Sequence, residues 1–238
     1  MDVPVELMAG GARLRLLPQR AVFLPEHGTL LVADAHIGKA HAFRRLGVPV
    51  PTGTTQATLQ RLTEAVTTTG ATHIVFLGDL LHAARGRSPD TMATFARWRQ
   101  AHASLQLTLV RGNHDSHAGD PPVDWGVDCV DEPFGLPGLA GLALCHHPDA
   151  PLPPHADGAE VPYVLAGHVH PSTVLGGRAH ERLRLPCFHF GPQRGVLPAF
   201  GEFTGTHTLP RGPLDQVFVS TGAEVRQIHV RPTLHLPA

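Results

Sequence analysis

The chain has 238 residues, of which 42% are hydrophobic and 16% are charged, proportions that belong to a folded globular protein and exclude a disordered one. Its 19 Lys and Arg against 20 Asp and Glu give a formal net charge of -1. The protein therefore has no overall positive charge, so any contact with nucleic acid has to rest on a local patch of basic residues.

Apolar runs alternate with longer polar-apolar segments in the first half of the chain. The runs TLLVADAH (29–36), THIVFLGD (72–79) and LQLTLVRGNHD (105–115) predict strands, the last of which runs into a glycine turn. The segments 51–70 and 88–103 predict helices; Gly70 is a stop signal for the first, and Ser88 and Pro89 suit the cap and first position of the second. This β-α-β-α-β order favours parallel strands with helical crossovers.

After Pro121 the pattern becomes mostly β, with short apolar runs separated by Pro and Gly. Residues 149–162 read as a surface loop and not as a domain linker, because residues suited to metal binding lie on both sides. We therefore expect a single α/β domain over residues 1–238, with a two-layer sheet core and helices outside. The segment 187–203 is a candidate edge strand for a dimer. The strands expected in this half are 142–148, 163–171, 187–191, 195–200 and 217–222.

No targeting or membrane signal is visible in the sequence. The N-terminus has no basic region followed by an apolar stretch, and no run approaches the ~18 apolar residues of a membrane span. The three cysteines (Cys129, Cys145 and Cys187) include no CxxC pair, which disfavours a disulfide framework. We expect a cytoplasmic protein without a membrane contact.

Five of the apolar runs end in side chains that bind metal ions. In open sheets with parallel strands, ligands bind outside the carboxyl ends of the strands, so residues far apart in sequence can meet there. Each motif alone is a weak signal, since a lone Gly-Asp is usually a turn and a lone histidine usually lies on the surface. Five in succession indicate a shared site. The residues expected to be metal ligands are Asp34, His36, Asp79, Asn113, His146, His168 and His170.

This ligand set contains oxygen and nitrogen donors and no thiolate, which suits Mn²⁺, Fe²⁺, Zn²⁺ or Co²⁺. Seven ligands are too many for one ion but enough for two if a carboxylate bridges them, because paired ions lie roughly 3.5–4 Å apart. Asp79 is the natural bridge, since it is the only carboxylate of its motif. Gly78 before it lets the backbone approach closely. We expect two divalent ions, with Mn²⁺ as the first choice.

The ordered motifs D-x-H, G-D, G-N-H-D, H-x-P and G-H-x-H, spanning residues 34–170, resemble those of the calcineurin-like metallophosphoesterase superfamily. The resemblance implies a four-layered α/β/β/α sandwich. It also implies one ion held by Asp34, His36, Asp79 and His170, and a second held by Asp79, Asn113, His146 and His168. His146 matches the ligand position because it stands two residues before Pro148; His147 is the competing assignment.

Two longer stretches give a narrower resemblance. DAHIGKAHAFRRLGVPVP (34–51) and VLPAFGEFTGTHTL (196–209) resemble the bacterial PdeM-type proteins, which are ligase-associated DNA-damage-response endonucleases. This resemblance implies a DNA substrate, a function in DNA repair, and DNA ligase and helicase-like partners.

Phosphodiester hydrolysis needs a proton or positive charge at the leaving oxygen. His114 is the candidate, because it follows ligand Asn113, and Asp115 is expected to orient it and hold it protonated. Lys39, Arg44 and Arg45 are expected to bind phosphate, with a solvated basic helix face as the alternative. Arg85 and Arg87 form either a basic rim of the site or a solvated loop. We expect His82 to neighbour the ligands and the pair Asp131-Glu132 to be solvated.

The same ligand set suits other functions. The same metals would serve a phosphatase or a small-nucleotide phosphodiesterase, because fold and metals set the reaction class and not the substrate. One tyrosine and two tryptophans leave few platforms for stacking bases, which weakens the DNA alternative. A non-catalytic scaffold is disfavoured, because such proteins usually lose ligands.

Overall fold

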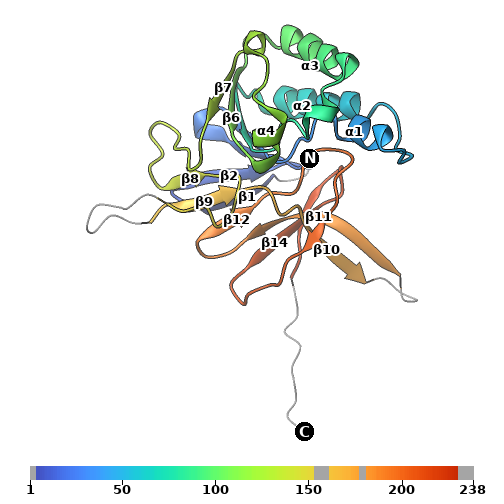
Figure 1. Ribbon diagram of the computed structural model, residues 1–238. Coiled ribbons are helices and arrows are strands. Elements are labelled where there is room, and N and C mark those ends of the chain that lie inside the picture. The colour runs from blue at the N-terminus through green and yellow to red at the C-terminus, as the bar shows by residue number, and fades with distance from the viewer. Residues whose placement is uncertain (1–3, 153–160, 177–180, 230–238) are drawn as a thin grey trace.

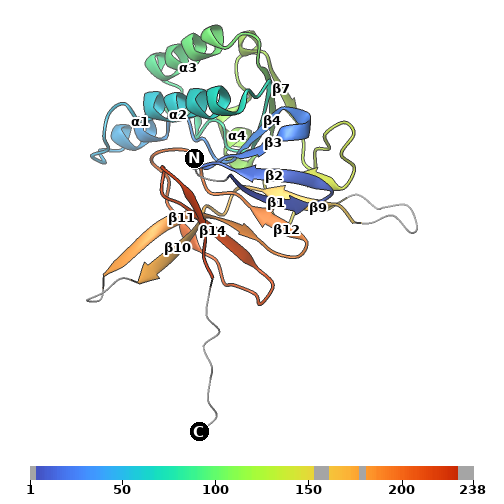
Figure 2. The ribbon, with the colours of Figure 1, turned by 180° about the vertical axis from the view of Figure 1, so that it is seen from behind.

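Two β-sheets lie face to face in the computed structural model, and helices cover the outer face of the first sheet (Figure 1). The structure describes residues 4–152, 161–176 and 181–229. Figure 2 shows the same layers from behind, with the helices on one side of the molecule and the second sheet on the other.

The first sheet has seven strands in the order β1 to β7, which is also their order along the chain. Strands β1 to β4 form an antiparallel meander, and β4 to β7 run parallel to one another. The parallel part places the carboxyl ends of three central strands at one edge. The strands are β1 (Val5–Ala9), β2 (Ala12–Leu16), β3 (Val22–Leu24), β4 (Thr29–Val32), β5 (His73–Leu77), β6 (Gln106–Val110) and β7 (Val127–Val130).

The apolar runs of the central strands follow from burial on both faces. In β5, Ile74 and Phe76 pack into the core beneath the helices, and Val75 and Leu77 pack between the two sheets. Side chains alternate between the faces of a strand, so a strand covered on both sides must be apolar throughout.

Four helices lie in the first half of the chain: α1 (Lys39–Arg45), α2 (Thr54–Thr69), α3 (Pro89–Ala101) and α4 (Asn113–Ala118). The predicted boundary signals of the two longer helices are confirmed. The Ser88 hydroxyl accepts the backbone N–H of Thr91 at 3.2 Å, and Gly70 ends α2 in the left-handed conformation.

The second sheet is built from the second half of the chain. Its main path is β13-β10-β11-β12-β9-β8, with β14 paired to β11 and β15 paired to β14. Strands β8 and β9 are parallel, so their carboxyl ends also meet. The strands are β8 (Leu142–Leu144), β9 (Tyr163–Ala166), β10 (Pro171–Gly176), β11 (Arg182–Phe190), β12 (Arg194–Val196), β13 (His207–Thr208), β14 (Gln216–Ser220) and β15 (Val225–Gln227).

The α/β fold class is confirmed, with three corrections in detail. Among the described residues no helix covers the outer face of the second sheet, so the fourth layer is not found there. The segment 187–203 is not an edge, because β11 and β12 both have partners on either side. The third predicted strand ends at Val110, and α4 begins at Asn113. The predicted loop 149–162 lies largely outside the described residues.

Several elements were not predicted from the sequence. Strands β1 to β3 are short and flanked by surface turns, and α1 and α4 have seven and six residues, too few for a helical pattern to repeat. In the described parts of the chain no helix combines the length and the apolar character that a bilayer span requires.

Candidate active site

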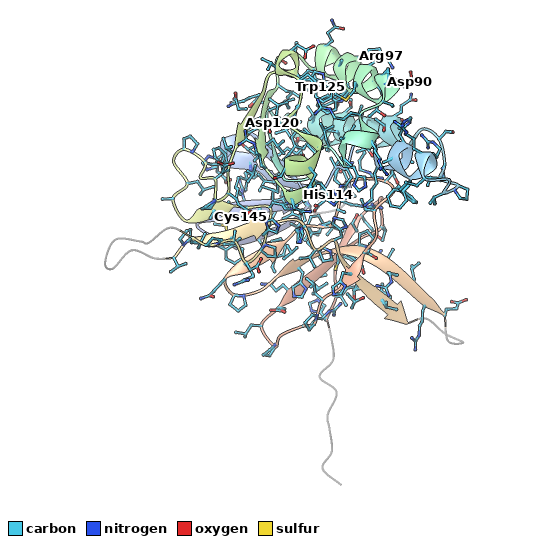
Figure 3. The ribbon with its side chains drawn as sticks, in the orientation of Figure 1. Asp90, Arg97, His114, Asp120, Trp125 and Cys145 are labelled. Carbon is cyan, nitrogen blue, oxygen red and sulfur yellow. The ribbon has the colours of Figure 1, made fainter. Side chains whose placement is uncertain are left out.

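Five loops from the two sheets meet at one place and bring together the seven predicted ligands. Loops after β4, β5 and β6 carry the ligands of the first half of the chain, and loops after β8 and β9 carry the histidines of the second half. Figure 3 shows His114 at this junction, at the end of α4 that faces the second sheet. The meeting point is the one that parallel strands predict.

One cluster forms around His170. Its Nε2 atom lies 3.3 Å from both Asp34 Oδ1 and His36 Nε2. The other ring nitrogen, Nδ1, donates to the Gly205 carbonyl at 3.0 Å, so Nε2 presents a lone pair to the cluster. Asp34 Oδ1 and His36 Nδ1 are buried and have no hydrogen-bond partner.

A second cluster forms around His146, which is fully buried. Its Nδ1 donates to the Leu77 carbonyl at 3.0 Å, which leaves a lone pair on Nε2. That atom lies 2.9 Å from Asn113 Oδ1, 3.0 Å from His168 Nδ1 and 3.5 Å from Asp79 Oδ1.

Asp79 lies between the two clusters. Its Oδ1 faces His146, and its Oδ2 lies 3.9 Å from His36 Nε2. Burial and the neighbouring Asp34 raise the pKa of Asp79 to about 6. One carboxylate therefore presents an oxygen to each cluster, as a bridging ligand would.

The donor set fits divalent cations. Carboxylate oxygens and imidazole lone pairs point toward one another, an arrangement that repels itself unless a cation lies between them. Burial is the main cause that lowers the pKa values of His36, His146 and His168, which keeps these imidazoles in the neutral form that binds metals. The clustered Asp and His residues can hold metal ions.

The backbone at these ligands is strained. Among the described residues, six non-glycine residues have a positive φ, and five of them are predicted ligands. Such conformations cost of order 1–3 kcal/mol each and persist where surrounding structure or a ligand enforces them. The five are Asp34 (φ 54°), His36 (47°), Asp79 (51°), His168 (68°) and His170 (52°).

Glycines make room for the ligand side chains. A Cβ on Gly78 would collide with the imidazole of His146, and one on Gly167 would lie 2.6 Å from Asp34 Oδ2. Both positions therefore require glycine for the close approach of a neighbouring ligand.

His114 faces the site, but not through the partner that the sequence suggested. Its Nδ1 donates to the His82 carbonyl at 2.7 Å, and its Nε2 lies 3.9 Å from Asp79 Oδ2. Asp115 is buried and accepts the backbone N–H groups of Asp79 (2.7 Å), Leu81 (3.2 Å) and Gly112 (3.0 Å). The prediction that Asp115 orients His114 is wrong; Asp115 fixes the loop that carries Asp79.

Replacing Asp115 by Ala is expected to destabilise the metal-free protein by about 3 kcal/mol. The substitution leaves three buried N–H groups without an acceptor, and an unsatisfied buried donor costs about 1–3 kcal/mol. Urea unfolding in EDTA measures the loss. The matched control is Asp131→Ala, because that side chain is 89% exposed. Equal stability of the two variants would contradict this role for Asp115.

The two adjacent histidines after β8 both belong to a group with His168 that could hold a metal ion, but their other contacts differ. His147 is half-buried, and its Nδ1 lies 2.6 Å from Glu132 Oε1, whereas His146 alone reaches Asn113 and Asp79. The geometry favours His146 as the ligand. The prediction that Glu132 is solvated is wrong, because its Oε2 also accepts the N–H groups of His146 (2.7 Å) and His147 (2.9 Å). Sequence reasoning missed this contact because 14 residues separate the partners.

The basic residues near the site differ in what they contact. Lys39 is half-buried at the start of α1, close enough for the Asp34 and Asp79 carboxylates to oppose the burial that lowers its pKa. Arg44 donates to the Pro51 carbonyl at 2.9 Å, and Arg87 donates to the carbonyls of residues 118–120, so both fasten loops. The side chains of Arg45 and Arg85 are exposed.

Comparisons with known proteins fit this geometry. No family model matches the sequence, and no curated protein matches it either. The solved structure of the Pseudomonas putida nuclease MPE is 39% identical in sequence, and the alignment covers 95% of this chain and 100% of that one with a TM-score of 0.77. The chain belongs to the metallophosphoesterase superfamily. This confirms the membership that the ordered motifs predicted, including the similarity to the PdeM type.

A second structure, the E. coli phosphoesterase Yfce, aligns over 84% of this chain and 97% of that one at 15% identity and a TM-score of 0.43, too low a likeness to inform on function. Metallophosphoesterases are hydrolases of phosphate esters, and this chain is an enzyme of that class. Its two side-chain clusters lie where the superfamily motifs predict.

Proposed function

We propose that this metallophosphoesterase uses two divalent metal ions to hydrolyse phosphodiester bonds in DNA. The observation that carries the proposal is the position of Asp79, whose two oxygens face two separate clusters of ligand atoms. The similarity to the nuclease MPE over nearly the whole chain supports a nucleic-acid substrate. A function in DNA repair beside a DNA ligase and a helicase-like partner stays a prediction from the resemblance.

The proposed ligand sets follow the two clusters. Asp34, His36 and His170 would hold one ion, Asn113, His146 and His168 the other, and Asp79 would bridge them. When bound, the pair of ions would supply a water nucleophile at neutral pH and neutralise charge on the phosphate. We propose Mn²⁺ as the native metal, since the donor set combines hard oxygens with imidazoles.

The protein's own residues complete the chemistry. His114 presents Nε2 to the site, held in that orientation by the hydrogen bond from Nδ1 to the His82 carbonyl. From there it would donate a proton to the leaving oxygen. Lys39 would contact a phosphate oxygen, because it lies close enough to the buried carboxylates of Asp34 and Asp79 for their charges to act on its pKa.

Replacing Lys39 by Met is expected to lower kcat/KM for a dinucleotide roughly 10- to 100-fold, the value of one charge-assisted hydrogen bond to phosphate. Arg45→Met tests the alternative, since Arg45 is exposed on the same helix. A larger loss in Arg45→Met than in Lys39→Met would assign phosphate binding to the exposed arginine instead.

A second candidate is a phosphodiesterase for small nucleotides. Arg44 and Arg87 favour this candidate, because their guanidinium groups donate to backbone carbonyls. Two positive charges beside the site are therefore not free to bind the phosphates of a long polymer. Both candidates use the same ligands and the same His114.

The deciding experiment compares substrates after metal loading. Metal analysis is expected to find two Mn²⁺ per chain, and bis-p-nitrophenyl phosphate is expected to be hydrolysed faster than p-nitrophenyl phosphate. Single-stranded and plasmid DNA then separate a nuclease from an enzyme limited to small diesters. Preference for the monoester, or one ion per chain at full activity, would overturn the proposal.

A further inference from the structure

Two aromatic side chains beside the active site take no part in the core. The chain has 10 Phe, 2 Trp and 1 Tyr, all within the described residues. Every one of these except Phe43 and Phe203 belongs to, or packs against, a hydrophobic core cluster. Phe43 and Phe203 instead contact each other, with ring centroids 5.5 Å apart in an edge-to-face arrangement, and both are only partly buried.

The pair continues a row of rings that begins at the proposed proton donor. The ring of His114 stacks on that of His82 at 4.6 Å, and the ring of His82 lies 5.9 Å from that of Phe43. The row therefore leads from His114 to Phe203 and passes beside the predicted ligand His36, whose ring lies 5.1 Å from that of His114 and 5.2 Å from that of His82.

Phe43 and Phe203 also lie beside Lys39, the proposed phosphate contact. Phe43 and Lys39 are four residues apart on α1, so they lie on one face of the helix about 6 Å apart along its axis. Phe203, Lys39 and His36 line one small cavity between α1, α2 and the 201–203 segment. A cation and two partly exposed aromatic rings thus neighbour one another at the rim of the site.

We infer that Phe43 and Phe203 form a binding site for a nucleobase of the substrate, on the side of the scissile phosphate that carries the leaving oxygen. This inference rests on the proposed function, since it takes a nucleic-acid diester as substrate. Aromatic faces accept any base by stacking, and one such contact is worth ~1–3 kcal/mol, or about 5- to 150-fold in affinity. The side follows from His114, which would serve the leaving oxygen and begins the row of rings.

The alternative is purely structural. The segment 200–206 lies along the end of β4, where Phe200 and Gly201 donate to the Ala33 and Asp34 carbonyls at 2.8 and 3.1 Å. In that case the Phe43–Phe203 contact would only hold α1 against this segment, and its loss would lower kcat/KM for all substrates by the same factor.

Combining protein variants with altered substrates distinguishes base binding from a purely structural contact. The substrate is the dinucleotide TpT, compared with two versions in which one base, on either side of the phosphate, is replaced by an abasic sugar. The wild type is expected to lose about 10-fold in kcat/KM when the base on the leaving side is missing, mostly through KM. The ratio of kcat/KM for TpT over that abasic substrate is expected to fall toward one in Phe43→Ala and Phe203→Ala.

Further variants keep the test decisive. Phe203→Tyr, which retains an aromatic face, is expected to keep the ratio, and Phe203→Leu, which retains apolar bulk, is expected to lose it. Leu46→Ala is the matched control, since Leu46 is 61% exposed at the end of the same helix. An unchanged ratio in both alanine variants, or no dependence on the base in the wild type, would overturn the base-binding site while leaving the proposed function intact.

Failure of the proposed function has a different signature. If no diester is hydrolysed, the Mn²⁺-loaded protein is titrated with thymidine 3′-monophosphate and 5′-monophosphate, which place the base on either side of the phosphate, and with the corresponding deoxyribose phosphates that lack the base. Tighter binding of the nucleotide in the wild type, but not in Phe43→Ala, would still support the site. Equal affinities would overturn it.

Discussion

Replacing Asp79 by Asn is expected to make the metal-free protein more stable at neutral pH while removing its activity. Burial and the nearby Asp34 raise the pKa of Asp79 to about 6. Because the folded state binds the proton more tightly than the unfolded state, with its ordinary value of 3.8, this group makes stability fall as pH rises between about 4 and 6. Asn carries no charge and avoids that cost, a gain of roughly 1–3 kcal/mol at pH 8.

The pH dependence identifies the cause. Below about pH 3.8, the ordinary pKa, Asp79 is protonated in both the folded and the unfolded state, and the gain in the Asn variant is expected to vanish. The buried His36 and the half-buried His82 have lowered pKa values and act in the opposite sense, because they make the protein less stable as the pH falls below 6.5. They are present in both proteins, so the difference between wild type and variant isolates Asp79. Urea unfolding in EDTA at both pH values measures it.

Adding metal is expected to reverse the order of stability. Mn²⁺ should stabilise the wild type but add little to Asp79→Asn, because binding to the folded state alone raises its stability. Hydrolysis is expected to fall by on the order of 10²–10³, the value of removing one electrostatic contact from a transition state. Asp131→Asn is the exposed control. If Asp79→Asn bound two Mn²⁺ and kept its activity, the carboxylate would not be the bridge.

The sequence predicted the ligands better than the elements that carry them. Asp34, Asp79 and Asn113 could be found because each follows a strand buried on both faces, which reads as an unbroken apolar run ending in a polar residue. Strands β1 and β2 are buried only at alternate positions for most of their length, and β3, although buried, has only three residues. In β2, Arg13 and Arg15 alternate with buried leucines, and both form ion pairs on the surface of the sheet.

The contacts that hold the ligands in place could not be predicted from the sequence. Glu132 and His147 form a pair across 15 residues, and Gly205 meets His170 across 35, with no local pattern that announces either contact. Asp115 was misassigned because proximity along the chain suggested the adjacent His114, whereas the helical turn of α4 directs its carboxylate to the Asp79 loop. The sequence likewise does not show that the guanidinium of Arg44 donates to the Pro51 carbonyl.

Replacing His114 by Ala is expected to lower hydrolysis of TpT by 10²–10⁴ while leaving the metal content unchanged. The backbone N–H of residue 114, which donates to Asp79 Oδ1 at 2.9 Å, survives the substitution and keeps the proposed bridge in place. The imidazole that Nδ1 anchors on the His82 carbonyl does not survive, and the leaving deoxyribose oxygen then departs without a proton.

The leaving group distinguishes proton donation from mere positioning. p-Nitrophenolate leaves without a proton, so bis-p-nitrophenyl phosphate is expected to lose only on the order of 10-fold in His114→Ala, and added imidazole should restore part of the TpT activity. His117→Ala, an exposed histidine on the same helix, is the control. Equal losses for both substrates, with no rescue by imidazole, would assign His114 to phosphate binding and leave the proton donor to another group. In the wild type the ring of His114 is held in one orientation by stacking on the ring of His82, so the comparison of the two substrates reports the loss of an ordered imidazole.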